Sequence, residues 1–123
     1  MKPIRLFFYT FNANQLFSPI IGEYKSAKER LHSWGLSIQS QLKRRPRIPS
    51  KHLPCGIHIT YYVNKENFDP AAMCILTHKL ITLLELHTII QSVNNHTVNA
   101  IAFDFHYVKN INDEGCEISF VMD

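Results

Sequence analysis

The chain has 123 residues, of which 46% are hydrophobic, 19% charged and 11% aromatic. This composition fits one folded domain and excludes a disordered, collagen-like or coiled-coil chain. No apolar run approaches the ~18 residues that a membrane span needs, so no membrane association is expected. The apolar start of the chain stops at Asn12 without a small-residue cleavage site, which favours a strand over a signal peptide. We therefore expect a cytoplasmic location.

The spacing of apolar residues predicts six elements in the order β-α-β-α-β-β. Apolar residues that alternate with polar ones indicate strands, and apolar residues three or four positions apart indicate helices. The predicted fold is a single α+β domain over residues 1–123, with a four-stranded mixed sheet packed with two helices. The strands are predicted over residues 4–9, 57–63, 98–108 and 116–121, and the helices over residues 26–42 and 70–87.

Local signals place the ends of these elements. Ser26 and Glu29 have the spacing of a capping box, which predicts that the first helix begins at Ser26. Asp69 followed by Pro70 is a typical helix start, with Asp69 as the N-cap. The short polar stretch between the last two strands predicts that they form a hairpin.

Charge is divided unevenly along the chain, although the net charge is only +3. Residues 1–65 contain eleven Lys and Arg against two acidic residues, a net charge of +9. Residues 66–123 contain two Lys against eight acidic residues, a net charge of −6. The amino-terminal half therefore carries the surface that would attract an anionic partner.

The most basic stretch covers residues 43–52 and contains two prolines, which prevent a continuous helix. Cations on an extended loop suit phosphate contacts, because each neutralised phosphate releases counterions. The pattern favours DNA or an acidic protein as partner, and the alternative is a solubilising linker. The candidate nucleic-acid-binding residues are Lys43, Arg44, Arg45, Arg47 and Lys51.

The three cysteines are widely spaced and include no Cys-x-x-Cys pair, so neither a disulfide framework nor a zinc knuckle is predicted. Cys74 and His78 are one helical turn apart, but two ligands do not make a zinc site, and Cys74 is predicted to lie in the core. The sequence has no recognisable Ser/His/Asp or Cys/His arrangement and no glycine-rich phosphate loop.

The order of these segments resembles the RusA-like Holliday-junction resolvases. In that family a strand leads into an Asn-containing loop, and a helix with a tryptophan and a basic region follow. A strand then ends in a DPDN-type motif, a helix with a lysine follows, and a loop with two aspartates precedes the last strands. The resemblance implies a small, dimeric, Mg²⁺-dependent endonuclease that acts on branched DNA. The matching segments are residues 10–16, 67–72, 79–84, 89–98, 104–109 and 116–121.

The chain departs from this family at the residues that would hold the metal. Asp69 matches the first aspartate of the motif, but Ala71 and Ala72 replace its second aspartate and its asparagine. Asn94 and Asn95 replace the two aspartates of the later loop. Because Mg²⁺ prefers charged carboxylate ligands, a site with Asp69 as its only carboxylate should bind the ion weakly.

Lys79 matches the family's helix lysine and could contact phosphate, or its stem could simply pack along the helix. The prediction is thus a degenerate site of Asp69, Lys79, Asn94 and Asn95 beside a basic loop. The expected function is DNA binding by a homodimer, with little or no nuclease activity.

Two alternatives remain open. The first is an active Mg²⁺-dependent junction endonuclease whose acids come from unexpected places, for instance Glu66, Asp69 and Asp104. The second is a protein-binding inhibitor encoded by a phage or mobile element, because a scaffold can be re-used for a different function.

Overall fold

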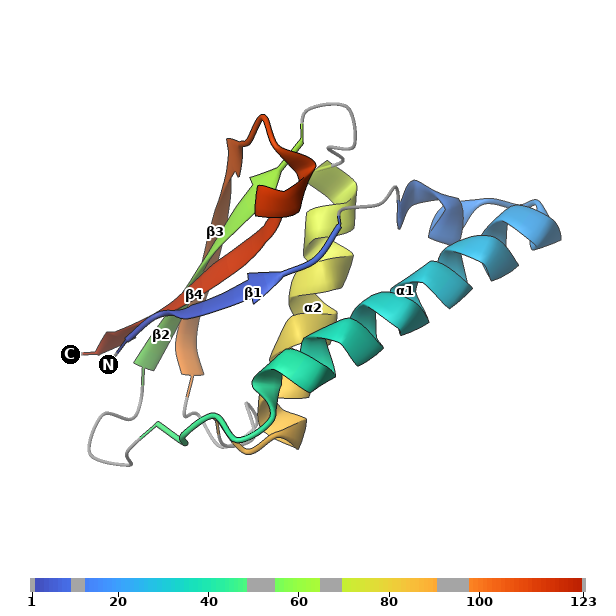
Figure 1. Cartoon of the computed structure of the whole chain (residues 1–123). Helices are drawn as coiled ribbons and strands as arrows, with labels where there is room; N and C mark the ends of the chain where they lie inside the picture. Colours follow the sequence, from blue (N-terminus) through green and yellow to red (C-terminus); the bar gives the residue numbers. More distant parts are fainter. Residues whose placement is uncertain (1, 10–12, 49–54, 65–69, 91–97, 123) are drawn as a thin grey trace.

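The chain folds into one mixed β-sheet with two helices against it, as the computed structural model in Figure 1 shows. The structure describes residues 2–9, 13–48, 55–64, 70–90 and 98–122. The predicted α+β class with four strands and two helices is confirmed. The elements are β1 (Ile4–Phe7), the 3-10 helix η1 (Ala13–Phe17), α1 (Ile21–Leu42), β2 (Cys55–Val63), α2 (Pro70–Leu86), β3 (Val98–Tyr107), the 3-10 helix η5 (Ile111–Asp113) and β4 (Gly115–Met122).

The strands are arranged in the order β1-β4-β2-β3. β4 runs antiparallel to β1 and to β2, whereas β3 runs parallel to β2. The predicted hairpin between the last two strands is therefore wrong, because β2 lies between β3 and β4. Residues 108–114, which include η5, are enough to step over β2, and α2 is the crossover that a parallel pair requires.

Helix α1 begins at Ile21, before the predicted start, so the capping box at Ser26 and Glu29 is wrong. Ser26 lies inside the helix. Ser18 instead supports the helix start: its Oγ accepts a hydrogen bond from the Ile20 N–H (3.1 Å) and donates one to the Glu23 carboxylate (2.6 Å). Helix α2 begins at Pro70 as predicted, while its predicted N-cap Asp69 lies outside the described residues.

The core lies between the helices and one face of the sheet (Figure 1). The predicted apolar stripe of α1 is buried at Ala27, Trp34, Ile38 and Leu42. Alternate residues of β1, β2 and β4 are buried with it, and they include Leu6, Ile59, Tyr61 and Ile118. The other sheet face, here named the open face, carries Arg5, Phe7, His58, Thr60, Tyr62, Ala100, Ala102, Asp104, His106, Glu117, Ser119 and Val121.

The cysteines divide between core and surface. Cys55 and Cys116 are buried free thiols, but Cys74 is exposed, so its predicted core position is wrong. The buried side of α2 passes instead through Met73, Leu76 and Leu80. In the part of the chain that the structure describes, no helix is long and apolar enough to cross a membrane.

Candidate functional site

Four of the predicted DNA-binding cations follow directly after α1. The helix stops at Leu42 because Lys43 is extended (φ −57°, ψ 135°) and Arg44 adopts a left-handed conformation (φ +64°). Pro46 then keeps the preceding residue out of helical geometry. The side chains of Lys43, Arg44, Arg45 and Arg47 are all exposed. We call residues 43–48 the basic segment.

The basic segment is held at both ends by the fold. Its last residue, Ile48, is 1% exposed, and the Ile48 N–H donates to the Ile89 carbonyl (3.0 Å). Near its start, the Arg45 N–H donates to the Leu42 carbonyl (3.3 Å). The cations therefore project from backbone that is pinned to α1 and to the turn after α2, which lowers the entropy lost when they meet a ligand.

Most hydrogen-bonding capacity of these cations remains available. The Arg45 Nε donates to the Gln41 carbonyl (3.3 Å) and the Arg47 Nε donates to the Thr88 carbonyl (3.2 Å). An arginine has five N–H donors, so each guanidinium keeps its terminal nitrogens for another acceptor. Across the described residues, no carboxylate lies within ion-pair distance of any cation in the basic segment.

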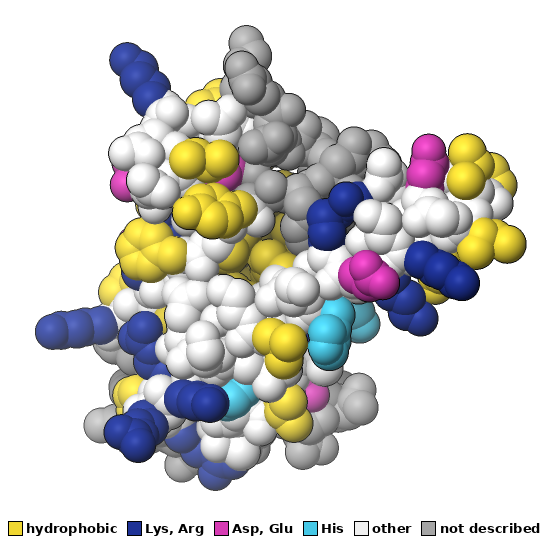
Figure 2. Space-filling view, turned by 45° about the vertical axis from the view of Figure 1, so that its right-hand side comes forward, with side chains coloured by type: hydrophobic (Ala, Val, Ile, Leu, Met, Phe, Trp, Pro, Cys, Tyr) yellow, Lys and Arg dark blue, Asp and Glu magenta, His cyan; other side chains and the backbone are white. Residues whose placement is uncertain are grey.

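Figure 2 shows that Lys and Arg side chains gather at the lower left of the molecule. This is the end where the basic segment leaves α1 and where the exposed Lys2 precedes β1 (Figure 1). Lys51, the fifth predicted cation, lies outside the described residues. Segments far apart in sequence thus contribute positive charge to one end of the molecule, and no described carboxylate forms an ion pair with the basic segment.

Of the four residues in the predicted degenerate metal site, the structure describes one. Asp69, Asn94 and Asn95 lie outside the described residues, and only Lys79 can be placed. Lys79 is half-buried in the middle of α2, about 14 Å along the axis from Pro70. Its Cε lies 3.3 Å from the point that a Cβ on Gly35 would occupy. The Lys79 stem therefore packs where α1 and α2 meet, which is the packing alternative stated for this residue.

The alternative acid Asp104 lies on the open face. Its Oδ1 is 3.4 Å from His58 Nε2 and its Oδ2 is 3.9 Å from His106 Nε2. Glu66, like Asp69, lies outside the described residues. Within the described ranges, no group of three or more His, Cys, Asp and Glu side chains is arranged to hold a metal ion.

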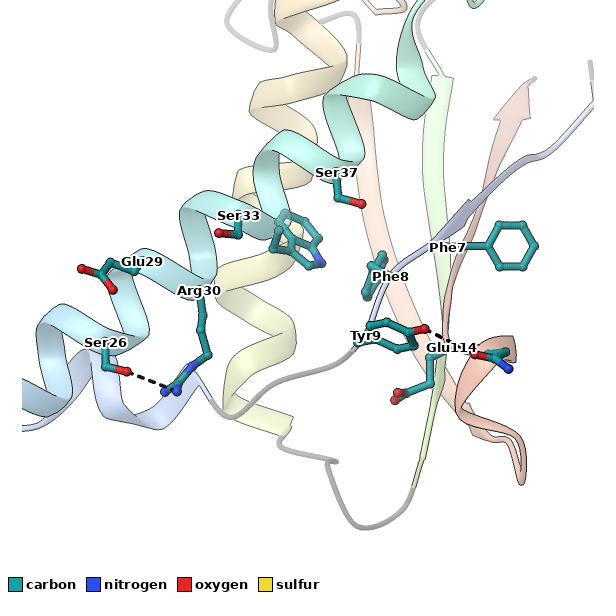
Figure 3. A pocket seen from close by; sticks show the side chains of 11 residues that line it. Phe7, Phe8, Tyr9, Ser26, Glu29, Arg30, Ser33, Ser37 and Glu114 are labelled. Atoms are coloured by element: carbon teal, nitrogen blue, oxygen red, sulfur yellow. Dashed lines mark hydrogen bonds between the residues drawn. The ribbon is translucent and has the colours of Figure 1, made fainter.

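A pocket of about 700 Å³ lies between α1 and the chain around β1 (Figure 3). Phe8, the residue after β1, points into it and stacks edge-on with Trp34 (ring centroids 5.3 Å apart), whereas Phe7 points to the other side of the strand. The hydroxyls of Ser26, Ser33 and Ser37 line the wall formed by α1.

Glu114 lines the same pocket and was not singled out from the sequence, where it is one acid in a polar turn. It is 1% exposed, and its Oε2 accepts a hydrogen bond from the Asn64 N–H (3.0 Å). The Trp34 Nε1 is buried without a hydrogen-bond partner among the described residues. The pocket combines an aromatic floor with polar walls, a lining that suits a small amphipathic molecule.

Two buried thiols and one buried phenol are unsuited to chemistry at neutral pH. Burial raises the pKa of the Cys116 thiol to about 12, although the charge of Arg5 lowers it in part. Burial likewise raises the pKa of the Cys55 thiol and of the Tyr61 hydroxyl, and the hydrogen bond between the Tyr61 hydroxyl and Thr77 Oγ1 (2.5 Å) opposes the shift at Tyr61. These groups stay protonated and act as core residues.

Comparison of the chain with protein-family models, with curated proteins and with solved structures finds no match. The resemblance to RusA-like resolvases therefore rests on the sequence motifs alone. The α+β topology is compatible with it.

Proposed function

We propose that this protein binds DNA, duplex or branched, through the basic segment and the neighbouring exposed Lys2. The observation that carries the proposal is the presentation of Lys43, Arg44, Arg45 and Arg47: they are exposed, and no described carboxylate pairs with them. A pinned cationic segment loses little conformational entropy on meeting a polyanion.

The charge density of the segment favours nucleic acid over an acidic protein. Four cations lie within five residues, which span at most roughly 15 Å, and a DNA duplex presents about nine phosphates over that length. Every cation can therefore find a phosphate without a fixed register. An acidic protein surface would have to match the four positions individually. Binding is then electrostatic, because phosphate contacts position a protein without reading bases.

The proposal includes little or no nuclease activity for this protein. The sequence places Ala71, Asn94 and Asn95 where the family that it resembles has metal-binding carboxylates, and an amide oxygen brings no charge to offset the dehydration of Mg²⁺. A four-way junction incubated with excess protein and Mg²⁺ or Mn²⁺ should stay intact. Cutting would favour the endonuclease alternative.

The test of DNA binding compares two double variants over a salt series. Lys43→Gln/Arg44→Gln removes two cations whose side chains make no hydrogen bond to the described chain. Lys25→Gln/Lys28→Gln removes two exposed cations near the start of α1 and is the matched control. Fluorescence anisotropy with a labelled junction and a labelled duplex measures log K against log salt concentration.

Two lost phosphate contacts should reduce the salt slope by about 1.8 and weaken binding about 60-fold at 0.1 M salt. The control should keep the slope of the unchanged protein. Equal slopes for the two variants, or binding that does not respond to salt, would overturn the proposal. A partner recovered from lysate that survives nuclease digestion would point to protein recognition instead.

A further inference from the structure

The structure contains a second surface feature that lies away from the basic segment. β3 is the last strand in the sheet order, and among the described strands only β2 pairs with it. Every residue from Asn99 to Tyr107 is exposed, on both faces of the strand. A ten-residue edge strand is long for a native sheet edge, since proteins usually shorten, bend or charge such strands.

One face of β3 carries an apolar row. Ile101, Phe103, Phe105 and Tyr107 continue the buried rows of the sheet, because they lie in register with Ile57, Ile59, Tyr61 and Val63 of β2. They are nevertheless 45%, 40%, 41% and 54% exposed, respectively. The helices thus bury this face of the sheet over β2 and leave it exposed over β3. A contiguous apolar patch of this kind marks an interaction surface.

The backbone of the same strand is arranged to pair. The Val108 N–H donates to the Val63 carbonyl (2.9 Å), so residue 108 turns its backbone polar groups toward β2. The N–H and C=O groups of successive residues in a strand point to opposite edges of the strand. Those of Ile101 and Phe103 are therefore directed to the outer edge of the sheet, away from β2. Ile101 and Phe103 therefore belong both to the apolar row and to the outer edge of the sheet.

We propose that β3 pairs antiparallel with β3 of a second copy of this chain about a two-fold axis at Phe103. Two four-stranded sheets then join into one of eight strands, with the helices of both copies on the same face. This places Phe103 opposite Phe103 of the partner, and Ile101 opposite the Phe105 position. The interface is isologous, as in most symmetric dimers.

The sequence of β3 selects this register. The strand spans Val98–Tyr107, so an axis at Phe103 lies near its midpoint. An axis one residue later would place the Asp104 carboxylates of the two copies directly opposite each other, which is destabilising. An axis one residue earlier would place Phe105 opposite Asn99. At Phe103, both Asp104 and His106 face alanine positions.

The apolar row alone offers about two thirds of the area found at the lower limit of stable interfaces. At these exposed fractions, the four apolar side chains offer roughly 100 Å² each, about 800 Å² for two copies. The strand edges and the open-face side chains of β3 add to this, toward the ~1,200 Å² at the lower limit of stable interfaces. A second copy fits this surface because one strand supplies both halves of a self-complementary interface.

Sedimentation velocity and light scattering should give twice the 14.3 kDa mass of the chain at micromolar concentrations. Phe103→Asp should give monomers, while Leu36→Asp, at a residue 53% exposed on α1, should leave the dimer intact. Far-UV circular dichroism checks that both variants are folded. A monomeric unchanged protein, or a dimer that survives in folded Phe103→Asp, overturns the proposal.

Disulfide trapping tests the register, even if Phe103→Asp fails to fold. In a Cys74→Ser background, which removes the exposed thiol, single cysteines replace Ile101, Phe103 or Tyr107. Only the cysteine at 103 should cross-link under mild oxidation, because paired Cα atoms lie about 5.5 Å apart and the two 107 positions would be about 26 Å apart. Equal cross-linking at all three positions overturns the register. DNA binding is measured separately, since this inference does not depend on it.

Discussion

Arg5 is the cation that we expect to hold the fold rather than a ligand. Its Nη1 donates to the carbonyls of Leu6 (2.9 Å) and Cys116 (3.1 Å), and its Nη2 donates to the Asp113 carbonyl (2.6 Å). The guanidinium carbon also lies 4.5 Å from the ring centre of Phe7 and 4.4 Å from that of Tyr62. One side chain thus ties β1 to β4 and to the turn before it.

The substitution Arg5→Gln removes most of these contacts. A glutamine can replace one of the three hydrogen bonds, so two are lost at about 1 kcal/mol each for a partly solvated group. The two ring contacts add roughly 0.5 kcal/mol each. The expected loss in free energy of unfolding is about 3 kcal/mol, which lowers the melting temperature of a chain of this length by roughly 12 °C.

Urea unfolding followed by circular dichroism measures this loss. Lys2→Gln is the control, because Lys2 is exposed at the same end of β1 and should change stability by less than about 0.5 kcal/mol. The salt slope of DNA binding should stay the same in Arg5→Gln, since its guanidinium is already occupied. Equal unfolding midpoints for Arg5→Gln and Lys2→Gln would show that the three bonds contribute nothing, and the reasoning would fail.

Three further predictions concern stability. Gly115 has φ +151°, and a Cβ there would lie 2.0 Å from the Leu6 carbonyl oxygen, so Gly115→Ala should cost about 3 kcal/mol or more in thermal melts. Gly22→Ala, where a Cβ meets nothing within 4 Å, should instead gain about 0.5 kcal/mol, and a loss of stability there would contradict the argument. Because burial raises the pKa of Cys116 to about 12 from 9.0, the folded state holds this proton more tightly than the unfolded state. This group should therefore leave the free energy of unfolding unchanged below pH 9. As pH rises from 9 toward 12, the free energy of unfolding should fall by up to ~1.4 kcal/mol per pH unit. The fall should be less steep in Cys116→Ala than in the unchanged protein.

The sequence predicted the existence and type of the main elements well because each has a strong period. The stripe of α1 through Trp34 and Ile38 and the alternation of β2 both leave little choice of structure. The residues at which the helices begin were less predictable. Ser26 and Glu29 satisfy the capping rule locally, but Ser18 supports the helix start by bonding Ile20 and Glu23, a contact between residues that sequence spacing does not single out.

Properties that depend on long-range packing could not be predicted. The polar turn at Asn110 suggested a hairpin, yet nothing local shows that β2 would insert between the last two strands. Cys74 differs from its neighbour Met73 by one helical position, which is enough to move a side chain from core to surface. The charge of the basic segment was visible in the sequence, whereas the absence of ion pairs between this segment and the described carboxylates could be seen only in the fold.

β3 shows most clearly what an alternating pattern does and does not determine. The pattern assigns Ile101, Phe103 and Phe105 to one face, and the register with β2 confirms that this face continues the core. Whether anything covers that face depends on where the helices end, and here they leave the last strand exposed. Burying an aromatic side chain that is 40% exposed stabilises by about 2 kcal/mol at 25 cal/mol per Å². A row of such side chains on a pairing edge therefore supplies a substantial driving force for association, and the antiparallel pair about Phe103 satisfies both the row and the edge at once.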